Sequence, residues 1–139
     1  MKSLSTVPLL SLVLLASGCG GLFHGKEAAE RGVAEFHTLY NQGKLAEIYS
    51  ASHSKMKGAA AEKQFLDLLG AVERKLGKVV QSVNAGFNVR SFNLTTTVVL
   101  NQTTTFEKGS GTEVFTFEMD GEKAVLVGYN INSNDLIVK

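Results

Sequence analysis

The stretch TEVFTFEMDGEKAVLVGYNI, residues 112–131, decides the fold that we expect for this chain. Its two halves are rich in valine, threonine and phenylalanine, residues that favour β-strands. Asp120-Gly121 lies between the halves and is one of the strongest short signals for a two-residue hairpin turn, because such turns need positive φ angles. The stretch therefore predicts two antiparallel strands joined by a tight turn.

The same turn predicts the register of the hairpin. With Asp120 and Gly121 as the central residues, the opposite pairs are Glu118–Lys123, Phe117–Ala124 and Phe115–Leu126. Side chains alternate between the two faces of a strand, so the phenylalanines share one face, which we expect helices to cover. The opposite face would carry apolar residues available for docking a partner: Val114, Val125, Val127 and Tyr129.

Strand-forming segments also precede the hairpin. Residues 78–83 and 87–92 favour strands and are separated by Asn84-Ala85-Gly86, while residues 93–106 are rich in threonine and valine with a period of two. Residues 107–111 contain two glycines and predict a turn. Together these segments predict an antiparallel meander of about four strands.

The first half of the chain has helical periodicity. Apolar residues recur three or four positions apart along the first predicted helix: Ala29, Val33, Phe36 and Tyr40. Gly43 is a typical cap for its C-terminus. A short helix is expected near residues 45–49 and a longer one at 60–76, with residues 50–58 as their connection. Helices followed by a meander predict an α+β fold, with the N-terminal helices packed on a curved antiparallel sheet.

The N-terminus carries a signal for export. Lys2 is followed by a short apolar run at residues 7–15 and by Ala16-Ser17-Gly18, which precede Cys19, the single cysteine of the chain. The run has about half of the ~20 apolar residues that a membrane-spanning helix needs. This pattern resembles the lipobox signal peptide of bacterial lipoproteins.

The resemblance implies cleavage between Gly18 and Cys19 and attachment of fatty acyl chains to Cys19. Two or three chains would hold the protein firmly on a membrane, whereas a single chain anchors only marginally. Gly20 stands where an aspartate would favour retention at the inner membrane, which implies the periplasmic leaflet of the outer membrane. The alternative is an ordinary signal peptide in which Cys19 has no role.

The implied processing divides the chain into three parts. Residues 1–18 form the signal peptide, residues 19–25 the lipidated cysteine and a tether of at most about 20 Å, and residues 26–139 a single domain. Removal of the signal peptide takes away Lys2 and leaves 14 − 1 = 13 basic against 13 acidic side chains. The balanced charge argues against nucleic-acid binding, and lipidation of Cys19 leaves no thiol for a disulfide, a nucleophile or a zinc cluster.

Two segments resemble a known group of folds. Residues 75–79, KLGKV, and residues 127–131, VGYNI, together with the order of helices and strands, are similar to cystatin-like or nuclear-transport-factor-2-like domains. More narrowly, they resemble an uncharacterised family of small proteobacterial lipoproteins, whose usual tryptophan falls at Ala124 here. The resemblance implies an α+β fold and an envelope location, and it brings no known activity.

In the fold class that the chain resembles, a cavity often lies between the helices and the sheet. His37 could form a polar patch at the mouth of such a cavity with Tyr40 and act as an acid or base. No spacing in the sequence supplies a partner carboxylate, so the alternative is a boundary histidine bonded to backbone or water. The histidines, acidic residues and glycines match no metal or phosphate site, and we expect neither a metal nor a cofactor.

These observations lead to three hypotheses about function. The first is a noncatalytic, lipid-anchored module that binds an envelope protein, a second copy of itself or a small apolar ligand near the membrane. The second is a small enzyme that uses His37 in a cavity between helices and sheet. The third is a structural component of the cell envelope.

Overall fold

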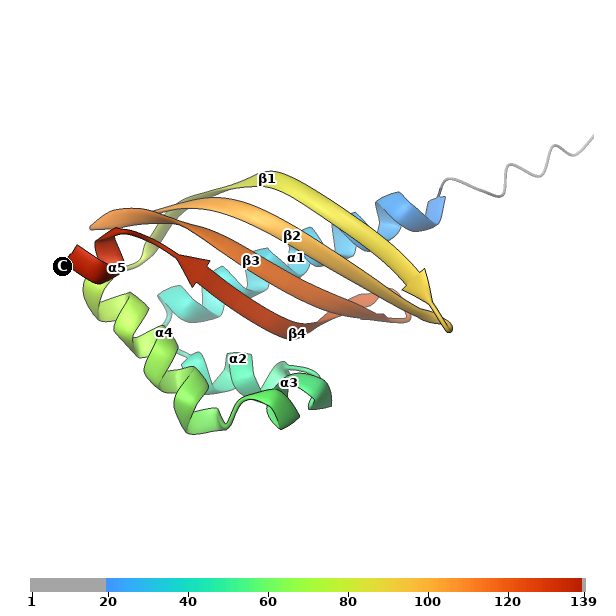
Figure 1. Cartoon of the computed structure of the whole chain (residues 1–139), viewed down its shortest axis with the longest axis horizontal. Helices are drawn as coiled ribbons and strands as arrows, with labels where there is room; N and C mark the ends of the chain where they lie inside the picture. The colour runs from blue at the N-terminus through green and yellow to red at the C-terminus, as the bar shows by residue number, and fades with distance from the viewer. Residues whose placement is uncertain (1–19, 139) are drawn as a thin grey trace, which may run out of the picture.

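The helices and strands occupy separate parts of the chain (Figure 1). The computed structural model describes residues 20–138, so the predicted signal peptide, with Gly18 at its end, and Cys19 lie outside the described residues. The described elements are α1 (Gly20–Asn41), α2 (Leu45–Ala51), α3 (Ser54–Ala59), α4 (Glu62–Leu76), β1 (Val79–Phe92), β2 (Thr95–Phe106), β3 (Gly109–Asp120), β4 (Lys123–Asn132) and α5 (Asp135–Val138). The predicted α+β fold with a curved antiparallel sheet is confirmed.

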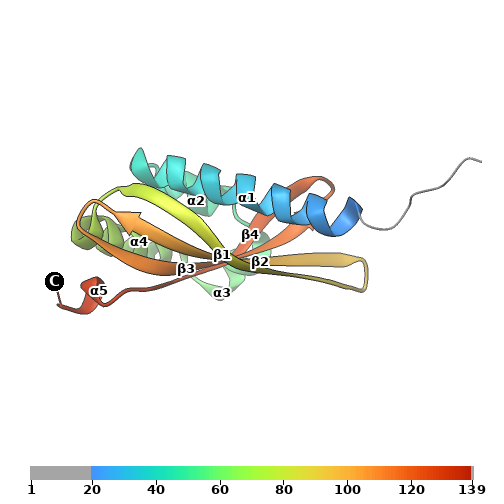
Figure 2. The same cartoon turned by 90° about the horizontal axis from the view of Figure 1, so that it is seen from above.

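The sheet is a meander with the order β1-β2-β3-β4, and each strand is antiparallel to the next. α1 crosses one face of the sheet and contacts all four strands. Figures 1 and 2 show α2, α3 and α4 gathered beside the β4 edge, which leaves most of the other face, here called the open face, uncovered. Within residues 20–138, no helix has the length and apolar character needed to cross a membrane.

α1 is longer than the sequence predicts. It begins at Gly20, so residues 20–25, expected as an extended tether, form its first turns. Glycine is a poor helix former, which hid this part of the helix from the sequence pattern. At Gly25 the glycine has a packing role, because a Cβ there would lie 3.3 Å from the side chain of Val98.

The predicted connection at residues 50–58 contains the short helix α3. Its N-cap is His53, whose Nδ1 accepts a hydrogen bond of 3.1 Å from the backbone N–H of Lys55. The backbone N–H of His53 donates to the carbonyl of Leu126 at 2.9 Å, which fastens α3 to the β4 edge. Histidine is not among the residues that usually cap helices, so the sequence carried no clear signal for this one.

The β3–β4 turn lies one residue later than predicted. Its central residues are Gly121 and Glu122, and of these Gly121 has a positive φ, +60°. The register is therefore shifted by two residues, and the observed pairs are Asp120–Lys123, Met119–Ala124, Glu118–Val125 and Phe117–Leu126. Because the shift is even, the faces are unchanged. The four residues predicted to face the helices are all buried: Phe115, Phe117, Ala124 and Leu126.

A β-bulge in β4 determines where Tyr129 lies. The pairing with β3 passes from Leu126 directly to Gly128, so Val127 is an extra residue in β4. Beyond the bulge the side chains have the opposite phase, and Tyr129 lies opposite Phe115 on the face that α1 covers. The prediction that Tyr129 belongs to a docking set on the open face is therefore wrong.

β1 is one continuous strand, although Asn84-Ala85-Gly86 predicted a break. Ala85 is accommodated as a bulge, because the pairing with β2 passes from Asn84 directly to Gly86. The turn from β1 to β2 is Asn93-Leu94, which the sequence pattern assigned to the following strand. The φ angles of these two residues are +46° and +64°, and such a turn favours asparagine or glycine over leucine.

The left-handed backbone conformation of Leu94 should destabilise the protein. Its side chain is fully exposed, and a left-handed backbone costs a residue with a Cβ about 1–2 kcal/mol. We expect Leu94→Gly to raise the free energy of unfolding, measured by urea denaturation, by about 1 kcal/mol. Leu94→Ala keeps the Cβ and should change the stability by less than about 0.5 kcal/mol. Equal gains in both variants would show that the backbone conformation is not the cause.

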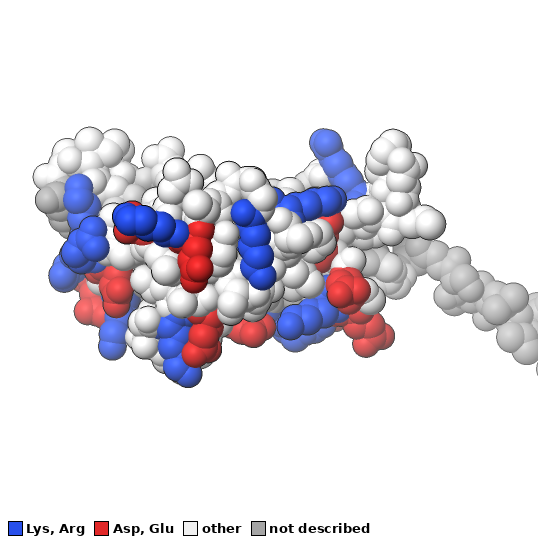
Figure 3. All heavy atoms as spheres, turned by 90° about the horizontal axis from the view of Figure 1, so that it is seen from below, with Lys and Arg blue, Asp and Glu red and all other residues white. Residues whose placement is uncertain are grey.

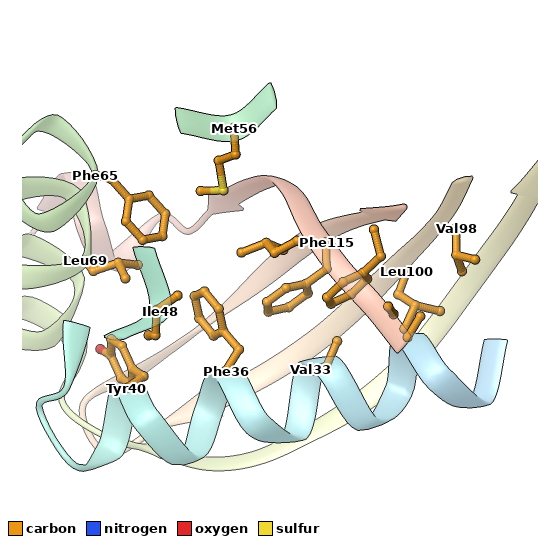
Figure 4. Packing of buried hydrophobic residues seen from close by; sticks show 14 of the residues in the cluster. Val33, Phe36, Tyr40, Ile48, Met56, Phe65, Leu69, Val98, Leu100 and Phe115 are labelled. Carbon is orange, nitrogen blue, oxygen red and sulfur yellow. The ribbon is translucent and has the colours of Figure 1, made fainter. Parts of the chain in front are cut away.

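The core lies between α1, α4 and the inner face of the sheet, with aromatic side chains at its centre. Phe36 packs edge-on against Phe115, with ring centroids 5.0 Å apart, and stacks on Tyr129 at 4.8 Å. Figure 4 shows Phe36 pointing from α1 toward Phe115, with residues of α2 and α4 alongside. The predicted apolar stripe of the first helix is confirmed, because all four of its residues are buried: Ala29, Val33, Phe36 and Tyr40.

α1 approaches the sheet closely at Gly32. A Cβ at this position would lie 2.7 Å from Cε1 of Phe117, inside van der Waals contact. We expect Gly32→Ala to cost about 1–3 kcal/mol through overpacking, which outweighs a gain of about 1 kcal/mol in helix propensity. Gly70→Ala in α4 is the control, because its Cβ meets only the flexible end of Arg74 and the propensity gain should prevail. Higher thermal stability in both variants would contradict the close packing.

Candidate functional site

A buried carboxylate, Glu113, lies at the centre of a polar network on the inner face of the sheet. Its side chain is 1% exposed, and three side chains donate hydrogen bonds to it. Oε2 accepts from Nε2 of His37 at 2.8 Å and from Oγ1 of Thr104 at 2.5 Å. Oε1 accepts from the hydroxyl of Tyr129 at 2.7 Å. Donors from α1, β2 and β4 thus meet at the carboxylate of Glu113 on β3. A carboxylate can accept three hydrogen bonds because it has two acceptor oxygens.

The network continues from Thr104 to β1. The hydroxyl of Ser82 lies 3.0 Å from the hydroxyl of Thr104 and donates to Oε1 of Gln102 at 3.1 Å. Among residues 20–138, no buried side-chain nitrogen or oxygen lacks a hydrogen-bond partner. A network in which every member is satisfied fixes the position of α1 on the sheet.

His37 connects this network to the surface. Its side chain is mostly buried and packs edge-on against Phe36 and Phe115, with centroids 5.8 and 5.6 Å away. His37 donates through Nε2 to Glu113, and this is its one hydrogen bond in the described chain, which leaves Nδ1 as an acceptor. The ring also lines an open hollow of about 570 Å³, the polar groove, with Glu30, Val33, Ala34, Ser82, Asn84 and Gln102.

Tyr40 does not reach the polar groove, contrary to the prediction from the sequence. It is buried, and its hydroxyl donates to the carbonyl of Gly77 at 2.8 Å. Burial raises the pKa of Tyr40, and the negative charges of Glu73, Glu113 and Glu107 raise it further. Tyr40 is therefore a neutral side chain that joins α1 to the end of α4.

Tyr40, which is buried, and Tyr129, which is half-buried, predict a loss of stability at alkaline pH. Burial first, and then the charge and hydrogen bond of Glu113, raise the pKa of Tyr129 well above the usual 10.0. The unfolded chain releases this proton at a lower pH than the folded chain. The contribution of Tyr129 to the free energy of unfolding is therefore fully present below about pH 10 and decreases as the pH rises further. Each such tyrosine contributes a slope of about 1.4 kcal/mol per pH unit. We expect Tyr129→Phe to remove one contribution, measured by urea denaturation at increasing pH, and an unchanged slope would contradict this account.

Glu113 is the residue of this candidate site that sequence reasoning missed, although a signal for it exists. It lies 76 positions from His37, so local spacing cannot link the pair. Along β3, however, Glu113 is in phase with Phe115 and Phe117, which face the core. A charged residue in the inward phase of a strand indicates a buried partner, because an unpaired charge would be costly there.

The His37–Glu113 pair has the geometry of a proton carrier. A carboxylate that binds one ring nitrogen orients the imidazole, and the other nitrogen remains available to accept a proton. In the part of the chain that the structure describes, no group of three histidine, cysteine or acidic side chains is placed to hold a metal ion.

A second hollow, the apolar crevice, lies between α1, α2 and the β3–β4 hairpin. Its lining is mainly apolar, with one acidic and one basic residue, and includes Glu35, Phe36, Leu39, Ile48, Phe117, Lys123 and Leu126. Ligand pockets are typically apolar with a few polar groups at fixed positions. The apolar crevice has this kind of lining, but it is narrow, and several of the residues that line it are buried core side chains, among them Phe36, Ile48, Phe117 and Leu126.

The open face is less apolar than the sequence predicts. Val114 lies on it but pairs with Asn130 of β4, and Val125 pairs with Glu118 of β3. Val127, the third valine of the predicted docking set, is the bulge residue of β4. Polar side chains therefore interrupt the expected apolar surface. Because large exposed docking patches are usually contiguous, the open face does not resemble one.

The outer edge of β1 has no strand beside it in the described chain. At its start, the side-chain amide of Asn41 accepts from the N–H of Val79 at 2.8 Å and donates to its carbonyl at 3.0 Å. For residues 80–92 of the described chain, one backbone hydrogen bond outside the pairing with β2 is present, from the N–H of Gly86 to Oδ1 of Asn84 at 2.8 Å. Exposed apolar side chains follow this strand: Val80, Val83 and Phe87.

Comparison with known proteins assigns no family to this chain, because no family model, curated protein or solved structure matches it. The resemblance to cystatin-like domains and to small lipoproteins therefore stays a prediction from the sequence. Any assignment of function has to come from the geometry of the domain and from the motif around Cys19.

Proposed function

We propose that this protein is a noncatalytic, lipid-anchored component of the cell envelope whose domain binds an extended segment of a protein partner along β1. Acyl chains on Cys19 would hold it on the periplasmic leaflet of the outer membrane. The open edge of β1 supports the binding part of the proposal. The lipobox Ala16-Ser17-Gly18-Cys19 supports the anchoring part.

An unpaired strand edge binds extended peptides because its backbone N–H and C=O groups can continue the hydrogen bonding of the sheet. Residues 80–92 carry a single charged side chain, Arg90, so this edge lacks most of the charges that usually keep sheet edges apart. The Asn41 amide occupies both backbone groups of Val79 in the way that a peptide group of an added strand would. The β4 edge is a poorer candidate because α3 packs against it.

Photo-cross-linking in the native envelope tests the binding. A photoreactive residue in place of Val80 should capture a partner, and Val83→Lys should abolish the capture because a lysine on an edge strand opposes further pairing. Thr103→Lys is the matched control, since Thr103 is the exposed β2 partner of Val83. Equal capture in both lysine variants would refute binding along β1. No capture at Val80 would also refute it and would favour a structural role in the envelope.

Acyl labelling tests the anchor. We expect the native chain to incorporate a labelled fatty acid and Cys19→Ala to lose the label, because the thiol of Cys19 is the predicted attachment point. The Cys19→Ala chain should remain unprocessed or leave the membrane fraction. Normal labelling of Cys19→Ala would show that the anchor is elsewhere.

The His37–Glu113 pair favours a second candidate function, an enzyme that uses His37 as an acid or base in the polar groove. A positioned proton carrier contributes about 10²–10⁴-fold to a rate. The test is a screen for activity on small polar substrates. If His37→Gln lowers an activity found in this screen by about this factor, the result would support the enzyme. An activity that His37→Gln leaves unchanged would not involve this pair.

A further inference from the structure

Three exposed bulky apolar side chains belong to segments that lie at one end of the molecule. Phe92 at the end of β1 is 78% exposed, Leu94 in the β1–β2 turn is 107% exposed, and Phe23 near the start of α1 is 63% exposed. Figures 1 and 2 both show this turn and the first turn of α1 at the end of the molecule that lies opposite the C-terminus. We call Phe23, Phe92 and Leu94 the apolar tip. Where exposed apolar side chains form a patch, they often mark a contact site for a partner or a membrane.

The backbone of the turn adds a second observation. Leu94 adopts φ +64°, a left-handed conformation that residues with a branched or bulky side chain rarely adopt. A leucine here is unfavourable in water on two counts, its backbone conformation and its full exposure. Backbone strain that the surrounding structure maintains is often found where a protein binds something.

The position of the chain start indicates what the apolar tip contacts. The described chain enters α1 at Gly20, directly after Cys19, and residues 20–25 are helical, so no extended tether separates the two. Consecutive Cα atoms are about 3.8 Å apart, so acyl chains on Cys19 would place the first turn of α1 at the lipid surface. Figure 1 shows the β1–β2 turn, which contains Leu94, at this same end.

From these observations we infer that the apolar tip inserts into the interfacial region of the bilayer that holds the anchor. The inference rests on the anchoring part of the proposed function. The turn from Phe92 to Thr95 carries no charge, and in Figure 3 the outermost atoms of one lobe at this end are uncharged. Aromatic and leucine side chains next to an uncharged backbone turn suit the boundary between headgroups and acyl chains.

The neighbouring turn limits the depth of insertion. Glu122 of the β3–β4 turn lies 3.9 Å from His24 of α1, so a carboxylate lies beside the start of α1. Moving this charge into the hydrocarbon would be costly. The apolar tip therefore enters shallowly, by its own side chains, while the rest of the domain stays in water with the β1 edge accessible.

A tryptophan reporter tests the inference, because the native chain contains no tryptophan. The full chain with Phe92→Trp is produced with its anchor and reconstituted into phosphatidylethanolamine–phosphatidylglycerol vesicles. We expect its emission to shift to shorter wavelengths and lipids brominated on their acyl chains to quench most of it. Ile137→Trp is the matched control, since Ile137 is 79% exposed and lies in α5 at the opposite end. Its emission should stay that of a tryptophan in water.

Flotation of the vesicles separates the two possible failures. If the Phe92→Trp chain floats with the vesicles but its emission is unshifted and unquenched, the inserted tip is refuted and the anchor stands. If the chain does not float, the anchor and the inserted tip are both refuted. Leu94→Ser in the Phe92→Trp chain should reduce the quenching, and undiminished quenching would overturn the assignment of Leu94 to the membrane contact.

Discussion

Glu113→Ala should lower the free energy of unfolding by about 3–5 kcal/mol. The substitution removes the acceptor of three hydrogen bonds and leaves His37, Thr104 and Tyr129 without it in the core. Each buried polar group left without a partner costs about 1–3 kcal/mol. Thr104 recovers part of this, because its hydroxyl lies 3.0 Å from that of Ser82. Urea denaturation at neutral pH measures the loss.

Two further variants define the role of the carboxylate. Asp67→Ala removes an exposed carboxylate that pairs with Lys63 at 2.7 Å, and it should cost less than about 1 kcal/mol. Glu113→Gln keeps the shape but presents an NH₂ group to a site built from donors, so its loss should be intermediate. A cost for Glu113→Ala no greater than that for Asp67→Ala would show that the buried network contributes little to stability.

Phe115→Ala should cost a similar amount, about 3–5 kcal/mol, by creating a cavity at the centre of the core. Phe115 is fully buried, and its ring contacts four other rings: Phe36, His37, Phe117 and Tyr129. The cavity would also remove the apolar support of the His37–Glu113 pair. Thermal and urea unfolding both measure this loss.

Phe92→Ala is the matched control for Phe115→Ala, because it makes the same change at a side chain that is largely exposed. Surface substitutions away from special backbone or buried features usually change stability by less than about 0.5 kcal/mol. Similar losses for the two variants would mean that Phe92 is packed against the domain. That result would also weaken the assignment of Phe92 to the membrane contact.

The inner face of the sheet was predictable because alternation along a strand is a local property. Phe115, Phe117 and Leu126 kept the predicted face even though the turn lies one residue later, since a shift of two residues preserves the faces. Tyr129 was not predictable, because a single extra residue at Val127 reverses the phase beyond it. No local preference in the sequence marks where such a bulge falls.

Of the two residues at the centre of the candidate site, His37 was predictable from a local pattern and Glu113 was not. His37 was identified from its place beside the apolar stripe of α1, and the structure places it at the polar groove. Its partner Glu113 reaches it only because the sheet folds under the helix, which is a long-range property. The tether was misjudged because three of the first six residues of α1 are glycines, whose low helix propensity outweighs other local signals.

Asn41 gives β1 a blocked end. A polypeptide that lies along this strand can extend toward Phe92 but not past Val79, whose backbone groups are already occupied. If β1 binds a partner as proposed, Asn41 thus fixes the point at which pairing with the partner must stop. A second copy of the chain that paired along β1 would meet the same block, so the hydrogen bonding between two copies would also stop at Val79.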